Sequence, residues 1–411
     1  YNIQVADTTF AEATLSGGFA AGDSISATVN STEVTYTVIA EDLTVNGDGN
    51  GGEATEQQAR NNITSKLAAA IDADGDLNGV VTASADGDTI TVSSVNNSDA
   101  VSLTTSVTAQ PAGWSQIGSD FYAETAGDTF GSRISLSADG TIVAIAASQN
   151  INGMVIDGNF PGHVRVFQWN GSSWNQLGND IDGEAGGDRS GWSVSLSADG
   201  TILAIGASEN DGNSGDTNHN SGHTRIYQWD GSAWNQLGDD IDGEDKGDRS
   251  GSAISLSNDG NTVAIGAYEH DGTKGHTRIY DWDGNAWVQR GTDIDGEAAV
   301  DASGRSVSLS GDGNTVAIGA SHNDGNSGQP YHNSGHTRIY DWNGTDWVQR
   351  GSDIDGEASG DLSSFPGLAL SSDGNTVAIS SIFNDNNGNI SAGHTRIYDW
   401  NGTDWVQRGS D

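Results

Sequence analysis

Tryptophan recurs at a nearly constant interval through the last three quarters of the chain. Neighbouring copies lie about 53 to 60 residues apart, at Trp114, Trp174, Trp234, Trp287, Trp347 and Trp405. A period of this length, with several short strands in each unit, is typical of a β-propeller or a related array of sheets. We therefore predict a mainly β fold in which residues 111–411 form a propeller of four-stranded blades.

The unit between Trp174 and Trp234 shows how one blade is built. Alternating apolar residues predict strands over residues 193–197, 202–206 and 223–229, and a fourth strand starts at the next tryptophan. Asp-Gly or Asn-Gly steps form the tight turns, because these dipeptides tolerate positive φ. The first three strands occur five times, but the tryptophan strand occurs six times. We expect either further blades in a longer parent chain, which would bring the total to six or seven, or a surplus tryptophan strand that is shared with a neighbouring subunit.

The connections of a four-stranded meander alternate between its two ends. The tight turns share one end, whereas the loops between strands two and three share the other end with the crossovers between blades. We call this second end the loop face. Its loops vary in length, and binding sites commonly lie on variable loops over a rigid scaffold. We predict ligand contacts there from residues that do not recur in every unit: Asp211, His219, His322, Tyr331 and His332.

Each crossover carries the sequence Asp-Ile-Asp-Gly-Glu. Oxygen ligands at alternating positions beside a glycine suit Ca²⁺, so we predict calcium sites in these loops. The alternative is that the carboxylates cap turns and pair with the arginine that recurs in strand three. The candidate ligands are Asp180, Asp182, Glu184, Asp188, Asp240, Asp242, Glu244, Asp293, Asp295, Glu297, Asp353, Asp355 and Glu357. A histidine also recurs in strand three, but each copy lies in a separate blade, so we do not expect a shared histidine metal ring.

Residues 130–148, FGSRISLSADGTIVAIAAS, followed by GHVRVFQWNGSSW, resemble the FG-GAP repeats of integrin α-type propellers. The resemblance covers about residues 113–411 and implies a propeller that acts in adhesion. FG-GAP calcium loops place several aspartates between strands one and two. Here that turn holds a single aspartate, such as Asp199 or Asp259. The family's calcium positions are therefore not transferred to this turn.

Residues 1–110 lack the repeat and predict a small α+β domain. Alternating patterns indicate strands at 24–29, 34–39, 80–85 and 89–94, and an apolar stripe indicates a helix over residues 53–73, with Thr55 as its N-cap. This order resembles modules that are common in phage tail proteins and large bacterial surface proteins. The resemblance implies a spacer or an assembly domain.

The charge balance excludes several kinds of partner. Asp and Glu number 57 against 16 Lys and Arg, which gives a net charge of −41. Such a surface repels nucleic acid backbones, so we predict no nucleic acid partner. No apolar run is long enough to span a bilayer, so we expect no membrane insertion. The chain begins at Tyr1 and stops within a repeat at Asp411, so we expect a parent chain that is longer at both ends.

The uniformity of the repeats bears on function. Active sites break the symmetry of a repeat, and no Ser/His/Asp set or carboxylate pair stands apart here. We therefore predict a non-enzymatic adhesion or structural protein at the cell surface or outside the cell. It would bind a cell-surface protein or glycan, or copies of itself, through the loop face. The alternatives are a virion tail or fibre component that recognises a host surface, and a glycan-processing enzyme built on a propeller.

Overall fold

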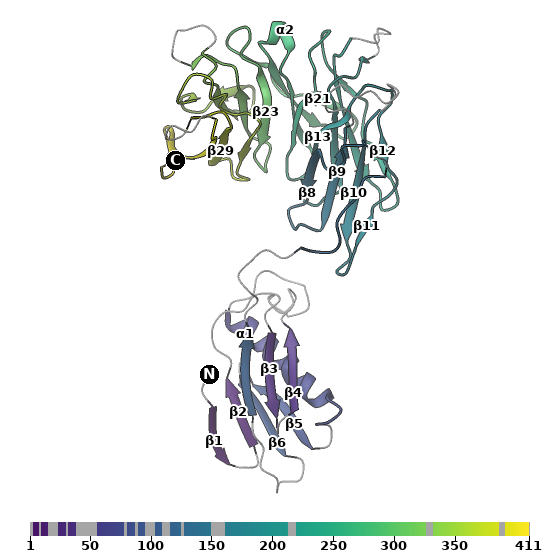
Figure 1. Cartoon of the computed structure of the whole chain (residues 1–411), viewed down its shortest axis with the longest axis vertical. Coiled ribbons are helices and arrows are strands. Elements are labelled where there is room, and N and C mark those ends of the chain that lie inside the picture. Colours follow the sequence, from purple (N-terminus) through teal and green to yellow (C-terminus); the bar gives the residue numbers. More distant parts are fainter. Residues whose placement is uncertain are drawn as a thin grey trace. The chain divides into compact units, whose positions relative to one another are not determined.

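The structure is a computed structural model (Figure 1). It describes residues 3–7, 10–14, 24–29, 32–37, 56–77, 80–86, 89–94, 103–108, 116–124, 127–148, 161–212, 219–325, 332–385 and 391–410. The chain divides into two compact units, Tyr1–Gln116 and Ile117–Asp411. Strands dominate the described residues, so the prediction of a mainly β fold is confirmed. Among these residues, no helix is both long and apolar enough to cross a membrane.

The N-terminal unit combines one helix with two small sheets. Its elements are β1 (Ile3–Asp7), β2 (Phe10–Thr14), β3 (Ser24–Val29), β4 (Thr32–Thr37), α1 (Glu56–Ala73), β5 (Val81–Asp86), β6 (Thr89–Ser94) and β7 (Leu103–Thr108). One sheet has the order β1-β2-β6-β5 and the other the order β4-β3-β7. The helix and the four predicted strands are confirmed, with strand bounds shifted by one or two residues. The predicted N-cap Thr55 lies outside the described residues.

The predicted apolar stripe of α1 forms the core of this unit. Ile63, Leu67 and Ile71 are fully buried, and they pack with Ile25 of β3 and Ile90 of β6. The helix therefore covers both sheets with one face, as the spacing of its apolar residues requires. Strands β1, β2 and β7 were not predicted, because each is only five or six residues long and consists largely of small or polar residues.

The second unit is a series of antiparallel sheets, which we number as blades 1 to 5. Blade 1 holds β8 (Arg133–Leu136), β9 (Ile142–Ala147), β10 (His163–Trp169), β11 (Trp174–Gln176) and β12 (Ile181–Asp182). Blade 2 holds β13 (Ser190–Leu196), β14 (Ile202–Ala207), β15 (His223–Trp229), β16 (Trp234–Gln236) and β17 (Ile241–Asp242). Blade 3 holds β18 (Ala253–Leu256), β19 (Thr262–Ala267), α2 (His270–Thr273), β20 (His276–Trp282), β21 (Trp287–Gln289) and β22 (Ile294–Asp295).

The last two blades repeat the plan. Blade 4 holds β23 (Ser303–Leu309), β24 (Thr315–Ala320), β25 (His336–Trp342), β26 (Trp347–Gln349) and β27 (Ile354–Asp355). Blade 5 holds β28 (Leu368–Leu370), β29 (Thr376–Ser381), β30 (His394–Trp400) and β31 (Trp405–Gln407). In every blade the four main strands pair in sequence order, and in blades 1 to 4 a two-residue strand of the crossover also pairs with strand three. The predicted meander is confirmed, and the two-residue strand is an addition to it.

Successive blades are joined by one repeated set of contacts. The innermost strands pack in the order β8, β13, β18, β23 and β28. Between blades 2 and 3, the amide of Ala198 donates to the carbonyl of Asn258, and the amide of Leu256 donates to the hydroxyl of Ser195. The indole of Trp287 donates to the carbonyl of Leu237, which lies in the crossover that precedes its blade. Each crossover thus anchors the tryptophan of the following blade.

The two end blades leave apolar side chains uncovered. In β8, Ile134 and Leu136 are 69% and 57% exposed, whereas the equivalent Ile254 and Leu256 of blade 3 are 9% and 7% exposed. At the other end Ile397 of β30 is 37% exposed, although its equivalent Ile339 in blade 4 is 1% exposed. Among the described residues, the inner blades are packed on both sides by neighbouring blades. The outer faces of blade 1 and blade 5 have no such neighbour.

Candidate functional site

The crossovers and the loops between strands two and three lie against each other on the loop face. The amide of Gly247, in a crossover, donates to the carbonyl of His219, and the amide of Glu209 donates to the carbonyl of Asp188. Crossover glycines lie so close to neighbouring backbone that a side chain has no room. A Cβ on Gly243 would overlap the carbonyl oxygen of Ser221. The glycine of the Asp-Ile-Asp-Gly-Glu motif therefore serves close packing between backbone segments.

The carboxylates of one crossover point to different partners. Asp180 accepts a hydrogen bond from the side chain of Gln176 at 2.7 Å. The side chain of Asp188 is buried and accepts from the amide of Ala185 and from Asn210. Glu184 faces the strand-three arginine Arg225 of the next blade at 3.6 Å. These side chains do not converge on one point, and the predicted pairing of crossover glutamates with arginine is confirmed.

The remaining copies repeat this division of roles. The arginine also donates to the carbonyl of the second motif aspartate, as Arg225 does to Asp182 at 2.8 Å. The equivalent acceptors are Asp242, Asp295 and Asp355. The first aspartates Asp240, Asp293 and Asp353 each accept from a glutamine, like Asp180. The glutamates Glu244, Glu297 and Glu357 face Arg278, Arg338 and Arg396 at 3.5 to 3.9 Å.

The carboxylates that do come together belong to two successive crossovers and meet at a histidine. In blade 2, His223 lies with its Nδ1 3.5 Å from Asp240 and 3.9 Å from Glu184. In blade 4, His336 lies with its Nδ1 3.8 Å from Asp353 and 3.8 Å from Glu297. Each trio could hold a metal ion, because its ligand atoms all lie within 4.8 Å of one another.

Burial keeps these histidines neutral despite the nearby carboxylates. It lowers the pKa of His223 to about 4, although Asp240 acts in the opposite direction. The pKa of His336 is lowered to about 4 by burial and by Arg338. Burial also raises the pKa of Glu184, against the effect of Arg225. At neutral pH these contacts are therefore not ion pairs. Each neutral imidazole has one ring nitrogen without a proton, and that nitrogen can bind a metal.

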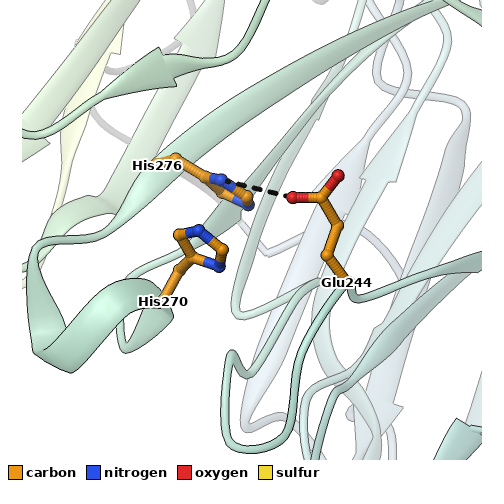
Figure 2. Close-up of side chains that lie close together, drawn as sticks. All are labelled: Glu244, His270 and His276. Atoms are coloured by element: carbon orange, nitrogen blue, oxygen red, sulfur yellow. Dashed lines mark ion pairs between the residues drawn. The ribbon is translucent and has the colours of Figure 1, made fainter.

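Blade 3 differs from blades 2, 4 and 5 in the loop between strands two and three. His270 stands where the other described blades carry Asn210, Asn323 and Asn384, each of which donates to a buried aspartate. The Nδ1 of His270 lies 3.0 Å from the buried Asp248, so the histidine takes over the place of the asparagine. Figure 2 shows its ring against that of His276, with centroids 4.1 Å apart, and Glu244 facing His276. Glu244, His270 and His276 form a third group that could hold a metal ion.

The residues predicted for ligand contact lie in the loops of the loop face and mostly organise the backbone. Asp211 accepts from the amides of His219 and Asn220. The amide of His322 donates to the carbonyl of Asp301. The carbonyl of His332 accepts from the amide of Gly360, as that of His219 does from Gly247, so these two histidines occupy equivalent places. Tyr331 lies outside the described residues.

The single aspartate of the tight turns has a structural role. Asp139 accepts from the amide of Thr141 and the hydroxyl of Ser137, and these bonds lower its pKa. Asp199 and Asp259 accept the same kinds of bond. The single aspartate of this turn therefore bonds to groups of its own turn, whereas FG-GAP calcium loops carry several aspartates at this place. His270, by contrast, was missed from the sequence, although aligning the repeats places it opposite asparagines.

No protein family and no curated protein matches the chain. Solved structures with a similar fold include a protein assigned as a 6-phosphogluconolactonase from Bacteroides uniformis, with 11% identity, a TM-score of 0.45 and coverage of 68% of this chain and 70% of that one. TolB from Acinetobacter baumannii has 12% identity, a TM-score of 0.38 and coverage of 65% and 51%. Hydrazine synthase from Kuenenia stuttgartiensis has 14% identity, a TM-score of 0.41 and coverage of 70% and 66%. At TM-scores below 0.5, these likenesses carry no information about the activity of this chain.

Proposed function

We propose that this chain is a non-enzymatic structural or adhesive protein, outside the cell or on its surface, which assembles with copies of itself through its end blades. The observation that carries the proposal is a pair of apolar faces that no described residue covers, Ile134 with Leu136 on blade 1 and Ile397 on blade 5. Exposed apolar side chains at positions that are buried or half-buried in the inner repeats are typical of an interface.

The last blade retains the groups that elsewhere hold a following blade. Arg290 and Arg350 each lie over the tryptophan pair of the next blade, 4.7 Å and 4.6 Å from the nearer ring. The equivalent Arg408 is 60% exposed and turns back to Asp399 at 2.6 Å. The inner crossover glycine Gly351 lies against Trp400 and Trp405, but among the described residues no atom lies within 4 Å of a Cβ built on the equivalent Gly409.

The first blade offers a partner surface for Ile397 of β30, but none for Arg408 and Gly409. Its tryptophan pair is already covered, because the indole of Trp174 donates to the carbonyl of Ile117 and Phe121 packs against Trp174. The segment 117–124 thus takes the place of a preceding crossover, while no strand among the described residues covers the outer face of β8. Strand β30 of another copy would cover that face. This head-to-tail contact joins two different surfaces and forms rings or filaments, depending on whether it closes.

The proposal predicts that aspartate on either end face blocks assembly. Leu136→Asp and, separately, Ile397→Asp should raise the concentration needed for assembly at least tenfold, since about 1.4 kcal/mol of lost contact energy has that effect. Size-exclusion chromatography with light scattering, and negative-stain imaging, measure the assemblies. Val348→Asp is the matched control, because Val348 is 50% exposed on the outer strand β26, away from both end faces. A wild-type chain that stays monomeric up to millimolar concentration would overturn the proposal.

Binding of a cell-surface protein or glycan is assigned to the loop face in this proposal, because its loops vary while the sheets repeat. A virion tail or fibre could be built by the same assembly. Imaging of native particles distinguishes a virion appendage from an assembly at the cell surface. Hydrolysis of a polysaccharide by the pure chain, lost on substitution of one loop-face carboxylate, would favour the glycan-processing alternative instead.

Calcium is the proposed ion for the acidic crossovers. Glutamate and aspartate oxygens from two successive crossovers approach one another beside His223 and His336, and Ca²⁺ prefers oxygen ligands. Millimolar Ca²⁺ should raise the melting temperature by several degrees relative to EGTA, since an ion that binds only the folded state stabilises it. The measurement is differential scanning fluorimetry at constant ionic strength. Equal melting temperatures in the two conditions would remove calcium from the proposal.

A further inference from the structure

The third blade holds a cluster that the other described blades lack. His276 is fully buried on β20, and neither of its ring nitrogens has a hydrogen-bond partner. A buried polar atom without a partner is costly to remove from water, and a ligand that bonds to it removes that cost. His336 in blade 4 has the same deficit, but only in blade 3 does a second histidine, His270, lie beside it.

We propose that Glu244, His270 and His276 form a site for a transition-metal ion of the zinc type. One carboxylate and two imidazoles are the donor set that suits Zn²⁺, whereas Ca²⁺ prefers oxygen ligands alone. The candidate ligand atoms lie within 4.8 Å of one another (Figure 2). Ligands at about 2.0–2.2 Å from a tetrahedral ion lie about 3.5 Å apart, so the group closes slightly on binding.

The surroundings of His270 prepare it for this role. Its Nδ1 lies 3.0 Å from the carboxylate of Asp248, which is 2% exposed. The contact lacks hydrogen-bond geometry, so this ring nitrogen, like those of His276, is buried without a hydrogen-bond partner. The His270 side chain is 18% exposed, so an ion can reach it from solvent. Asp293 lies 3.7 Å from the Nδ1 of His276.

The cluster also lies among carboxylates. Glu244 and Asp293 face His276 at 3.9 Å and 3.7 Å, and Asp248 lies beside His270. A bound cation would neutralise part of this negative charge.

The experiment titrates the full chain with Zn²⁺ by calorimetry in excess Ca²⁺ and Mg²⁺, so that sites made only of oxygen ligands are occupied. The tightest Zn²⁺ should bind at this cluster, the one group with two imidazoles among the described candidates, and Co²⁺ should give the visible absorption of a site with nitrogen ligands. His270→Asn installs the residue that the other repeats carry, so it keeps a donor to Asp248 and should fold normally. Its affinity for Zn²⁺ should fall at least tenfold. His322→Asn, on the same face but outside the cluster, should bind like the wild type.

Circular dichroism and melting of the metal-free variants separate binding from folding. A folded His270→Asn variant that binds Zn²⁺ as tightly as the wild type would overturn the site. The same conclusion follows if the wild type binds no Zn²⁺ at 100 µM, a concentration on the scale where weak sites become detectable. Binding of Zn²⁺ should not depend on assembly of the chain, because the cluster lies at the inner blade 3, away from the end faces.

Discussion

Acidification from pH 7.5 to 4.5 is expected to destabilise the metal-free propeller strongly, because His223 and His336 must remain neutral in the folded state. Their folded pKa is lowered to about 4 from an ordinary value of 6.5, first of all by burial. An unfolded chain takes up these protons below pH 6.5, whereas the folded chain takes them up only near pH 4. The stability from this difference is fully present above pH 6.5 and is lost as the pH falls toward 4.

The size of the effect follows from the two shifts. Each histidine contributes about 3 kcal/mol between those limits, at about 1.4 kcal/mol for each unit of pKa. The charged groups near the two histidines modify how steeply the stability depends on pH. Asp240 and Glu184 lie near His223, with Arg225 on the same strand, and Asp353, Glu297, Asp301 and Arg338 surround His336. Burial raises the pKa of Glu184 and Glu297, so their protonation at low pH returns part of the lost stability.

Urea unfolding in EDTA at pH 7.5, 6.0, 5.0 and 4.5 measures this dependence. The double variant His223→Gln with His336→Gln should unfold at lower urea at pH 7.5 but show a shallower loss toward pH 4.5. His332→Gln, in a loop, is the matched control and should keep the wild-type slope. A double variant with the same pH slope as the wild type would contradict the role of the two buried rings.

The blades could be predicted from the sequence because their signals are local. Alternation and Asp-Gly turns lie within a few residues, and the strands predicted at 193–197, 202–206 and 223–229 match β13, β14 and β15 closely. The two-residue strands were missed, because Ile181–Asp182 is too short to show alternation. In β12, Asp182 pairs with His163, and this pairing fixes the crossover beside strand three.

The grouping of the crossover side chains could not be predicted in the same way. Each motif appears in the sequence as one acidic loop, which suggests one site per loop. In the fold, the first aspartate of a crossover faces the histidine of its own blade and the glutamate faces the histidine of the next, as Asp240 does with His223 and Glu244 with His276. Sites formed from residues about 40 to 60 positions apart depend on blade packing, which no local pattern encodes.

The crossover glycine links this packing to stability, and Gly243→Ala should be among the most destabilising single changes in the chain. A Cβ at this position would overlap the carbonyl oxygen and carbon of Ser221, and both belong to backbone that cannot rotate away. The amide of Gly243 also donates to the carbonyl of Gly222 at 2.8 Å, so relief by movement would break that bond. We expect a loss of about 3 kcal/mol or more, at the upper end for overpacking.

Urea unfolding of Gly243→Ala at pH 7.5 tests the close packing directly, with Gly367→Ala as the matched control. Gly367 also lies in the propeller, and a Cβ there would meet no atom within 4 Å, so the control should stay within about 1 kcal/mol of the wild type. If the glycine served only a calcium loop, Gly243→Ala would lose stability in Ca²⁺ but match the wild type in EGTA. A loss of equal size in both conditions assigns the glycine to the backbone contact between the crossover and Ser221.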